Sequence, residues 1–207
     1  MSGVGAFAAM FAFGRRAEGA QAAAATAFKP AHHPQDEWLE KIPGKHRIVV
    51  DVTSAQGVPT AVGWVDNLYT AHKSGYGLEE ADLAIVVILR HAATAFGFDD
   101  AIWARHSKAL ADRAGYSDPK ASEPPKAHPF KLAPRTGFEG LVKRGAQFGV
   151  CDLSSHSIAR ALAGSGDADA TYKEMVANMI PSSRLVAAGV IGLTHAQEYG
   201  YTLVNVG

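Results

Sequence analysis

Apolar runs separated by amphipathic stretches predict an alternation of strands and helices along most of the chain. Residues 83–89 (LAIVVIL) are continuously apolar, which is typical of a central parallel strand covered on both faces. Residues 61–74 place their apolar positions on one helical face, and Gly75 is expected to end that helix. The predicted strands are 46–53, 83–89, 147–151, 183–187 and 201–206; the predicted helices are 61–74, 138–144, 155–163, 170–179 and 190–199, with a helical or irregular stretch at 92–114.

This alternation predicts one α/β domain over residues 46–207, a Rossmann-like, doubly wound sheet. About five mostly parallel strands are expected, with helices on both faces. The insertion at 116–135 contains five of the ten prolines and is predicted to be a long surface loop. Loops of this length often act as lids or contact partners.

The N-terminal 45 residues differ in character from the predicted domain. Residues 1–27 combine a short apolar stretch with an alanine-rich one, which favours a degraded or truncated export signal and therefore a periplasmic protein. The basic pair at 15–16 follows the apolar stretch instead of preceding it, so the alternative is an amphipathic arm that docks on a neighbour. The apolar stretch is too short to span a membrane. Residues 28–45 are expected to form an extended arm with one helical turn at 36–41.

Composition narrows the function classes. Lys+Arg and Asp+Glu both number 20, so no global charge favours nucleic acid. The single cysteine, Cys151, excludes an internal disulfide and a cysteine-based zinc cluster. The histidines lack ligand spacing, and no glycine-rich nucleotide loop opens a helix. We therefore predict no metal site, no cofactor and no nucleic-acid partner; the weaker alternative is a histidine-ligated metal site.

Candidate site residues come from the ends of the predicted strands, because open parallel sheets bind ligands beyond the carboxyl ends of their strands. The residues at these positions are Thr53 and Ser54 after the first strand, Arg90 and His91 after the second, Cys151 and Asp152 after the third, and Ala188-Gly189 after the fourth. For His91 the alternative is a structural hydrogen bond to a loop carbonyl. These residues are expected to lie along one edge of the sheet.

Cys151 is the candidate reactive group. It precedes a helix expected to begin near Ser154 or Ser155, and the positive end of a helix dipole favours a thiolate. Protonated His91 or His156 would act in the same direction, whereas the carboxylate of Asp152 would oppose it. For His156 the alternative is a solvent-facing position. For Cys151 it is a buried, inert side chain, since free cysteine is among the most buried residue types.

The order of these segments resembles the DsrE/DsrF-like sulfur-relay family over about residues 36 to 207. The strand QFGVC at 147–151 resembles the strand of that family that ends in cysteine. The ending SRLVAAGVIGLTHAQEYGYTLVNVG resembles its C-terminal strand, turn, helix and strand, through Gly189-Val190, Gln197 and Gly200-Tyr201. The segments EWLEKIPGKHRIVVDV and LAIVVILRH resemble an exported subgroup of the family.

The resemblance implies a Rossmann-like domain that assembles into trimers or hexamers. It also implies that Cys151 accepts a persulfide sulfur and passes it on; Asp152-Leu153, which follow it, depart from the small residues of established carriers. The expected function is therefore a sulfur carrier or thiol-ligand binder, a transferase at most. The alternative is a non-catalytic assembly or small-ligand-binding subunit. In either case the 116–135 loop or the N-terminal arm is the expected contact for a protein partner.

Overall fold

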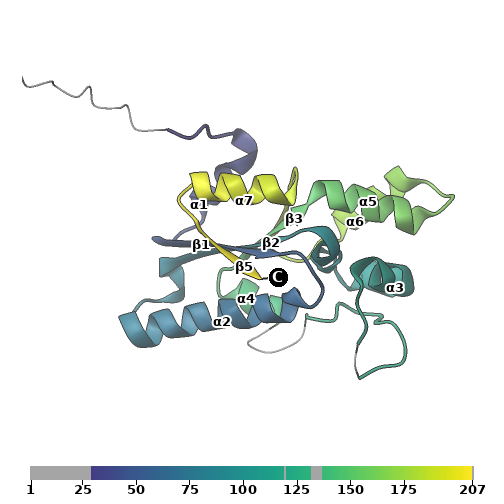
Figure 1. Ribbon diagram of the computed structural model, residues 1–207, viewed down its shortest axis with the longest axis horizontal. Helices are drawn as coiled ribbons and strands as arrows, with labels where there is room; N and C mark the ends of the chain where they lie inside the picture. The colour runs from purple at the N-terminus through teal and green to yellow at the C-terminus, as the bar shows by residue number, and fades with distance from the viewer. Residues whose placement is uncertain (1–28, 119, 132–136, 207) are drawn as a thin grey trace, which may run out of the picture. The chain divides into compact units, whose positions relative to one another are not determined.

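The computed structural model describes residues 29–118, 120–131 and 137–206 (Figure 1). The predicted leader at 1–27 lies outside these residues. Contacts divide the chain into a unit of residues 1–30 and a unit of residues 31–207. All the helices and strands of the described residues belong to the second unit, and this unit is described below.

The second unit is built on a five-stranded parallel sheet in the order β4-β3-β2-β1-β5, which confirms the predicted fold class. All seven residues of β2 are buried at the centre of the sheet, as its continuous apolar sequence predicts. The strands are β1 (His46–Val52), β2 (Leu83–Leu89), β3 (Gln147–Cys151), β4 (Ser183–Val186) and β5 (Thr202–Val206).

Helices cover both faces of the sheet (Figure 1). One core cluster joins one sheet face to a group of helices: α2 (Gly57–Tyr76), α3 (Asp100–Ala114), α4 (Phe138–Lys143), α5 (Asp152–Ala163), α6 (Ala168–Ala177) and the 3-10 helix η3 (His91–Gly97). A smaller cluster joins the opposite face to α1 (Glu37–Lys41) and α7 (Gly189–Glu198). We call this opposite face the α7 face. Two shorter 3-10 helices are η1 (Pro34–Asp36) and η2 (Glu80–Asp82).

Several predicted helix boundaries differ from the structure: α2 begins at Gly57, and α6 begins and ends two residues earlier than predicted. Helix α2 continues through Gly75 to Tyr76, because the left-handed residue that ends it is Gly77, with φ of 67°. Helix α5 begins at Asp152, not near Ser154 or Ser155, and Cys151 occupies its N-cap position. The Ser155 hydroxyl donates to the Cys151 carbonyl one turn earlier, at 2.9 Å, and therefore lies inside the helix.

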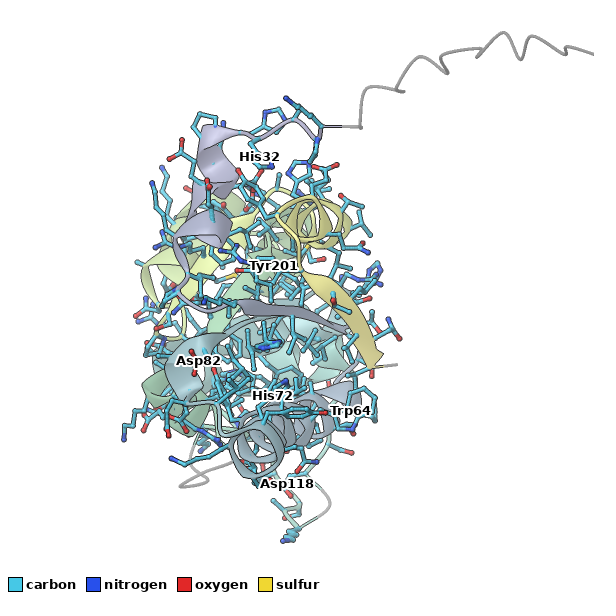
Figure 2. All side chains as sticks on the ribbon, turned by 90° about the vertical axis from the view of Figure 1, so that its left-hand side faces the viewer. His32, Trp64, His72, Asp82, Asp118 and Tyr201 are labelled. Atoms are coloured by element: carbon cyan, nitrogen blue, oxygen red, sulfur yellow. The ribbon has the colours of Figure 1, made fainter. Side chains whose placement is uncertain are left out.

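The arm at 31–45 packs on the α7 face. Its helical turn is α1, and Leu39 in this turn is buried against Val49 and Leu193. The hydroxyl of Tyr201, which is labelled in Figure 2, donates to the Leu39 carbonyl at 2.7 Å. A buried apolar side chain and a buried hydrogen bond therefore hold this part of the arm in place.

The Pro-rich insertion at 116–135 contains no helix or strand among its described residues, 116–118 and 120–131. Buried His128 anchors it: the ring Nε2–H donates to the Phe96 carbonyl at 2.8 Å, and Nδ1 accepts from the Phe130 N–H at 3.1 Å. Burial lowers the pKa of His128, so this ring is neutral at pH 7.

Candidate functional site

A buried ion pair lies at the carboxyl edge of the sheet on the α7 face. Asp51 on β1 accepts from Arg90 through both carboxylate oxygens: Nε to Oδ1 at 2.7 Å and Nη2 to Oδ2 at 2.8 Å. Asn205 on β5 donates a third hydrogen bond to Oδ2, at 2.8 Å. The Asp51 side chain is 3% exposed and that of Arg90 17%, so the acid is the inner partner and the arginine the outer one.

Three donors account for the burial of Asp51, since a carboxylate taken out of water is tolerated when it is paired and hydrogen-bonded. The pKa of Arg90 is raised, mainly by its hydrogen bond to Asp51, against the effect of burial. The negative charge of Asp51 raises it further. Arg90 therefore remains a cation, fixed in orientation by Asp51.

Cys151 ends β3 on the same sheet face as this ion pair. The parallel register of β2 and β3 continues to the residues just before Arg90 and Cys151, so these two residues are level on neighbouring strands. A side chain on Gly149 would meet Ile88, which places these two positions on the α7 face. Alternation along each strand then places Cys151 and Arg90 on that face as well. The exposed fraction of Cys151 is 5%.

Helix α7 begins against Arg90. A Cβ added to Gly189, the first residue of α7, would lie 2.4 Å from Cβ and 2.8 Å from Cδ of Arg90. Only glycine allows this approach at the start of the helix. The N-terminal turns of α5 and α7 therefore begin beside Cys151 and Arg90, respectively, and the first N–H groups of a helix have no partner within that helix.

Asp152 and His156 are brought together by α6. The hydroxyl of Tyr172 on α6 donates to Oδ1 of Asp152 at 2.5 Å, and the ring of His156 stacks on that of Tyr172 at 3.8 Å. His156 Nε2 lies 3.9 Å from Asp152 Oδ2. Burial, followed by the hydrogen bond and charge of Asp152, raises the pKa of Tyr172 to about 12. The Asp152 carboxylate is therefore held by α6.

The remaining predicted site residues, Ser54, His91 and Ser154, lie near the starts of helices. The Ser54 hydroxyl accepts from the Gly57 N–H at 3.0 Å, where α2 begins. His91 is exposed and starts η3 with φ of 53°, in the left-handed region. Ser154 is half-buried on the first turn of α5. The six predicted residues thus fall into separate groups, with Cys151 beside Arg90 and Asp152 with His156.

Sequence reasoning places Arg90 among the residues at the strand ends but misses Asp51, Asn205 and Tyr172 as site residues. One signal points to Asp51: it is the sole charge in the buried run IVVDV, and an acid there requires a partner. Arg90, which follows the next strand in the chain, is that partner. Tyr172 carries no comparable signal, because its role depends on how α5 packs against α6.

Within the described residues, no group of three or more histidine, cysteine or acidic side chains is placed to hold a metal ion. In the same part of the chain, every helix is too short or too polar to cross a membrane.

An apolar groove lies away from the strand ends, between α2 and the edge strand β5. Its lining includes Trp64, Tyr76 and Val204, and Trp64 and Tyr76 are exposed. Trp64 and His72 of α2, both labelled in Figure 2, line this groove. Further exposed apolar side chains, Leu153 and Val190, follow Cys151 and Gly189 closely in the chain.

In comparisons with known proteins, the chain matches no family description and no curated protein. The DsrE-like resemblance stays a prediction that rests on the residues quoted for it.

Proposed function

We propose that this protein is an exported, DsrE-like sulfur carrier that holds a sulfane sulfur, or a thiol-bound ligand, on Cys151. The observation that carries the proposal is the position of this thiol. Cys151 ends an inner strand at the ligand-binding edge of a parallel sheet, occupies the N-cap position of α5 and lies level with the cation Arg90.

In the proposed reaction, the Cys151 thiolate attacks the outer sulfur of a donor persulfide R–S–SH. The bond between the two donor sulfurs breaks, the donor leaves as R–S⁻, and Cys151 becomes a persulfide. An acceptor thiolate then attacks the outer sulfur and takes it, which returns Cys151 to the thiolate. Arg90 and the N–H groups at the start of α5 supply positive charge beside the sulfur throughout.

The test is intact-mass measurement after incubation with a low-molecular-weight persulfide. Wild type is expected to gain one sulfur, and a second protein thiol is expected to remove it. Cys151→Ser is the matched control, since this chain has no other cysteine. Equal masses for wild type and the control after incubation would disprove the carrier role.

The second candidate is a non-catalytic assembly or small-ligand-binding subunit in which Cys151 is inert. The low exposure of Cys151 and the apolar groove beside the edge strand β5 favour it. Reaction with an alkylating reagent under native conditions separates the candidates: an inert Cys151 reacts only when the protein unfolds, whereas a carrier thiol reacts in the folded state.

In both candidates we propose a homo-oligomer, a trimer or hexamer, with the 116–135 loop or the N-terminal arm as a further contact. The exposed apolar side chains of Trp64, Tyr76, Leu153 and Val190 support contact with other chains. Mass by light scattering tests the oligomer. The mass and N-terminus of the protein recovered from its native host test export to the periplasm.

A further inference from the structure

Arg90 presents different sides to the protein and to the edge of the sheet. Nε and Nη2 donate inward to Asp51, and Asn205 adds its hydrogen bond to the same carboxylate. The carboxylate lies beneath the arginine, with a side chain 3% exposed against 17% for Arg90. A molecule that approaches the edge therefore meets the guanidinium before it meets the acid.

The other charged groups at this edge are two helix N-termini and the acid Asp152. Helices α5 and α7 contribute the positive ends of their dipoles. Asp152, the acid next to Cys151 in the chain, is bound by Tyr172 of α6. Asp152 keeps its charge and its side chain is 30% exposed, but its partner α6 packs on the sheet face opposite the α7 face. On the α7 face beside Cys151, Arg90 and the start of α7 therefore favour a negative group.

We infer that the molecule that exchanges with Cys151 carries a carboxylate close to its reacting sulfur, and that Arg90 binds this carboxylate. A guanidinium held in a fixed plane suits the planar carboxylate. The inference rests on the proposed function and specifies the substrate class: small carboxylate-bearing thiols, persulfides and disulfides.

Two symmetrical disulfides of similar size and opposite charge test this selection. Dithiodipropionate ends in carboxylates and cystamine ends in ammonium groups. In each case the Cys151 thiolate attacks one sulfur, the disulfide bond of the reagent breaks, and one reagent thiolate leaves. The measured quantity is the initial rate of mixed-disulfide formation, followed by intact mass.

The preference is the rate with dithiodipropionate divided by the rate with cystamine. For wild type this ratio is expected to be about tenfold or more higher than for free cysteine. Salt is expected to reduce this preference, because it screens exposed charges. Equal normalised rates for the two reagents in wild type would overturn the inference.

Arg90→Gln leaves Asp51 buried without its ion-pair partner and risks unfolding, so the informative variant is the double change Asp51→Asn with Arg90→Gln. This variant replaces the ion pair with neutral amides and is expected to lose the preference. Arg90→Lys is expected to keep part of it, because the charge remains while the fork is lost. Arg160→Gln is the matched control, since Arg160 is an exposed arginine on α5, the helix that begins after Cys151. The preference of this variant for dithiodipropionate should equal that of wild type.

A second measurement does not depend on the thiol. Suberate has the length of dithiodipropionate but no sulfur, and its binding to Cys151→Ser is followed through the NMR signal of the Arg90 Nε–H. A saturable shift of that signal is expected. The absence of a shift would overturn the inference whatever the thiol does. If the signal shifts but neither disulfide reacts with wild type, Arg90 binds carboxylates and Cys151 is not a sulfur carrier. The failure of the carboxylate inference is therefore distinguishable from the failure of the proposed function.

Discussion

Asp51 holds Arg90 in place from beneath: both carboxylate oxygens accept from the guanidinium, at 2.7 Å and 2.8 Å, and the acid is almost completely buried. Asp51 is the second-last residue of β1, and Arg90 directly follows the neighbouring parallel strand, β2. Their pairing fixes the position of a cation level with Cys151, which ends β3. The first predictions concern this pair and the helix that begins beside it.

Asp51→Ala is expected to destabilise the protein by about 3–5 kcal/mol, because it leaves the partly buried Arg90 and the amide of Asn205 without their acceptor. Urea unfolding followed by circular dichroism measures the change. Glu37→Ala is the matched control, since it removes a carboxylate from the exposed ion pair with Lys41 and should have little effect. Equal losses for the two variants would contradict a structural role for the buried pair.

Gly189→Ala is expected to cost about 1–3 kcal/mol, because the new methyl group would overlap the Arg90 side chain and push α7 or Arg90 aside. The control is Gly63→Ala in α2, where an added Cβ meets nothing within 4 Å. That change should stabilise the protein by about 0.5–1 kcal/mol, since glycine is a poor residue inside a helix. If Gly189→Ala also stabilises, the close approach of α7 to Arg90 is wrong.

The strands are the part of this fold that the sequence predicts best. Residues 83–89 and 147–151 are apolar runs bounded by polar residues, and the structure has β2 and β3 at these residues. Helix starts are less predictable, because they depend on capping: α5 begins at Asp152 directly after the strand. A serine-rich sequence suggested a later start, yet Ser155 bonds back to the turn before it.

The candidate site is predictable only in part, for a geometrical reason. The end of an apolar strand identifies Cys151 from the sequence alone. The partners of the site come from distant positions: Arg90 lies 39 residues from Asp51, and Tyr172 lies 20 residues from Asp152. Which of these side chains meet depends on strand register and on the packing of α5 against α6, and periodicity in one segment specifies neither.

Tyr172→Phe is expected to change the stability of the protein at alkaline pH. The pKa of Tyr172 is raised from 10.0 to about 12, so its protonated form contributes stability that is complete below pH 10 and is lost as the pH rises through 12. The difference in free energy of unfolding between wild type and Tyr172→Phe should therefore shrink from pH 9 to pH 12. A difference that is constant over this range would show that the hydroxyl does not bind Asp152 in the folded protein.

His128→Gln is expected to alter the acid side of the stability profile. Burial lowers the pKa of His128, and Nδ1 must be unprotonated to accept from Phe130. The unfolded chain therefore binds the proton more readily, and the stability due to neutral His128 is lost as the pH falls below about 6.5. Urea unfolding between pH 7.5 and pH 5 measures this slope in both proteins. A steeper loss in wild type than in the variant is expected, and parallel profiles would contradict a neutral, buried role.

The last prediction concerns how reagents reach Cys151, whose exposed fraction is only 5%. If the thiol reacts through unfolding, the rate of alkylation by iodoacetamide is proportional to the unfolding equilibrium constant, and a stabilised variant reacts more slowly. Gly63→Ala, expected to add about 0.5–1 kcal/mol, would then slow the reaction about two- to fivefold. We expect no such slowing, because a carrier thiol at the edge of the sheet reacts from the folded state. Intact mass over time gives both rates, provided that urea unfolding confirms the added stability. A decrease in rate equal to the gain in stability would show that Cys151 is inert in the folded protein and would favour the assembly subunit over the carrier.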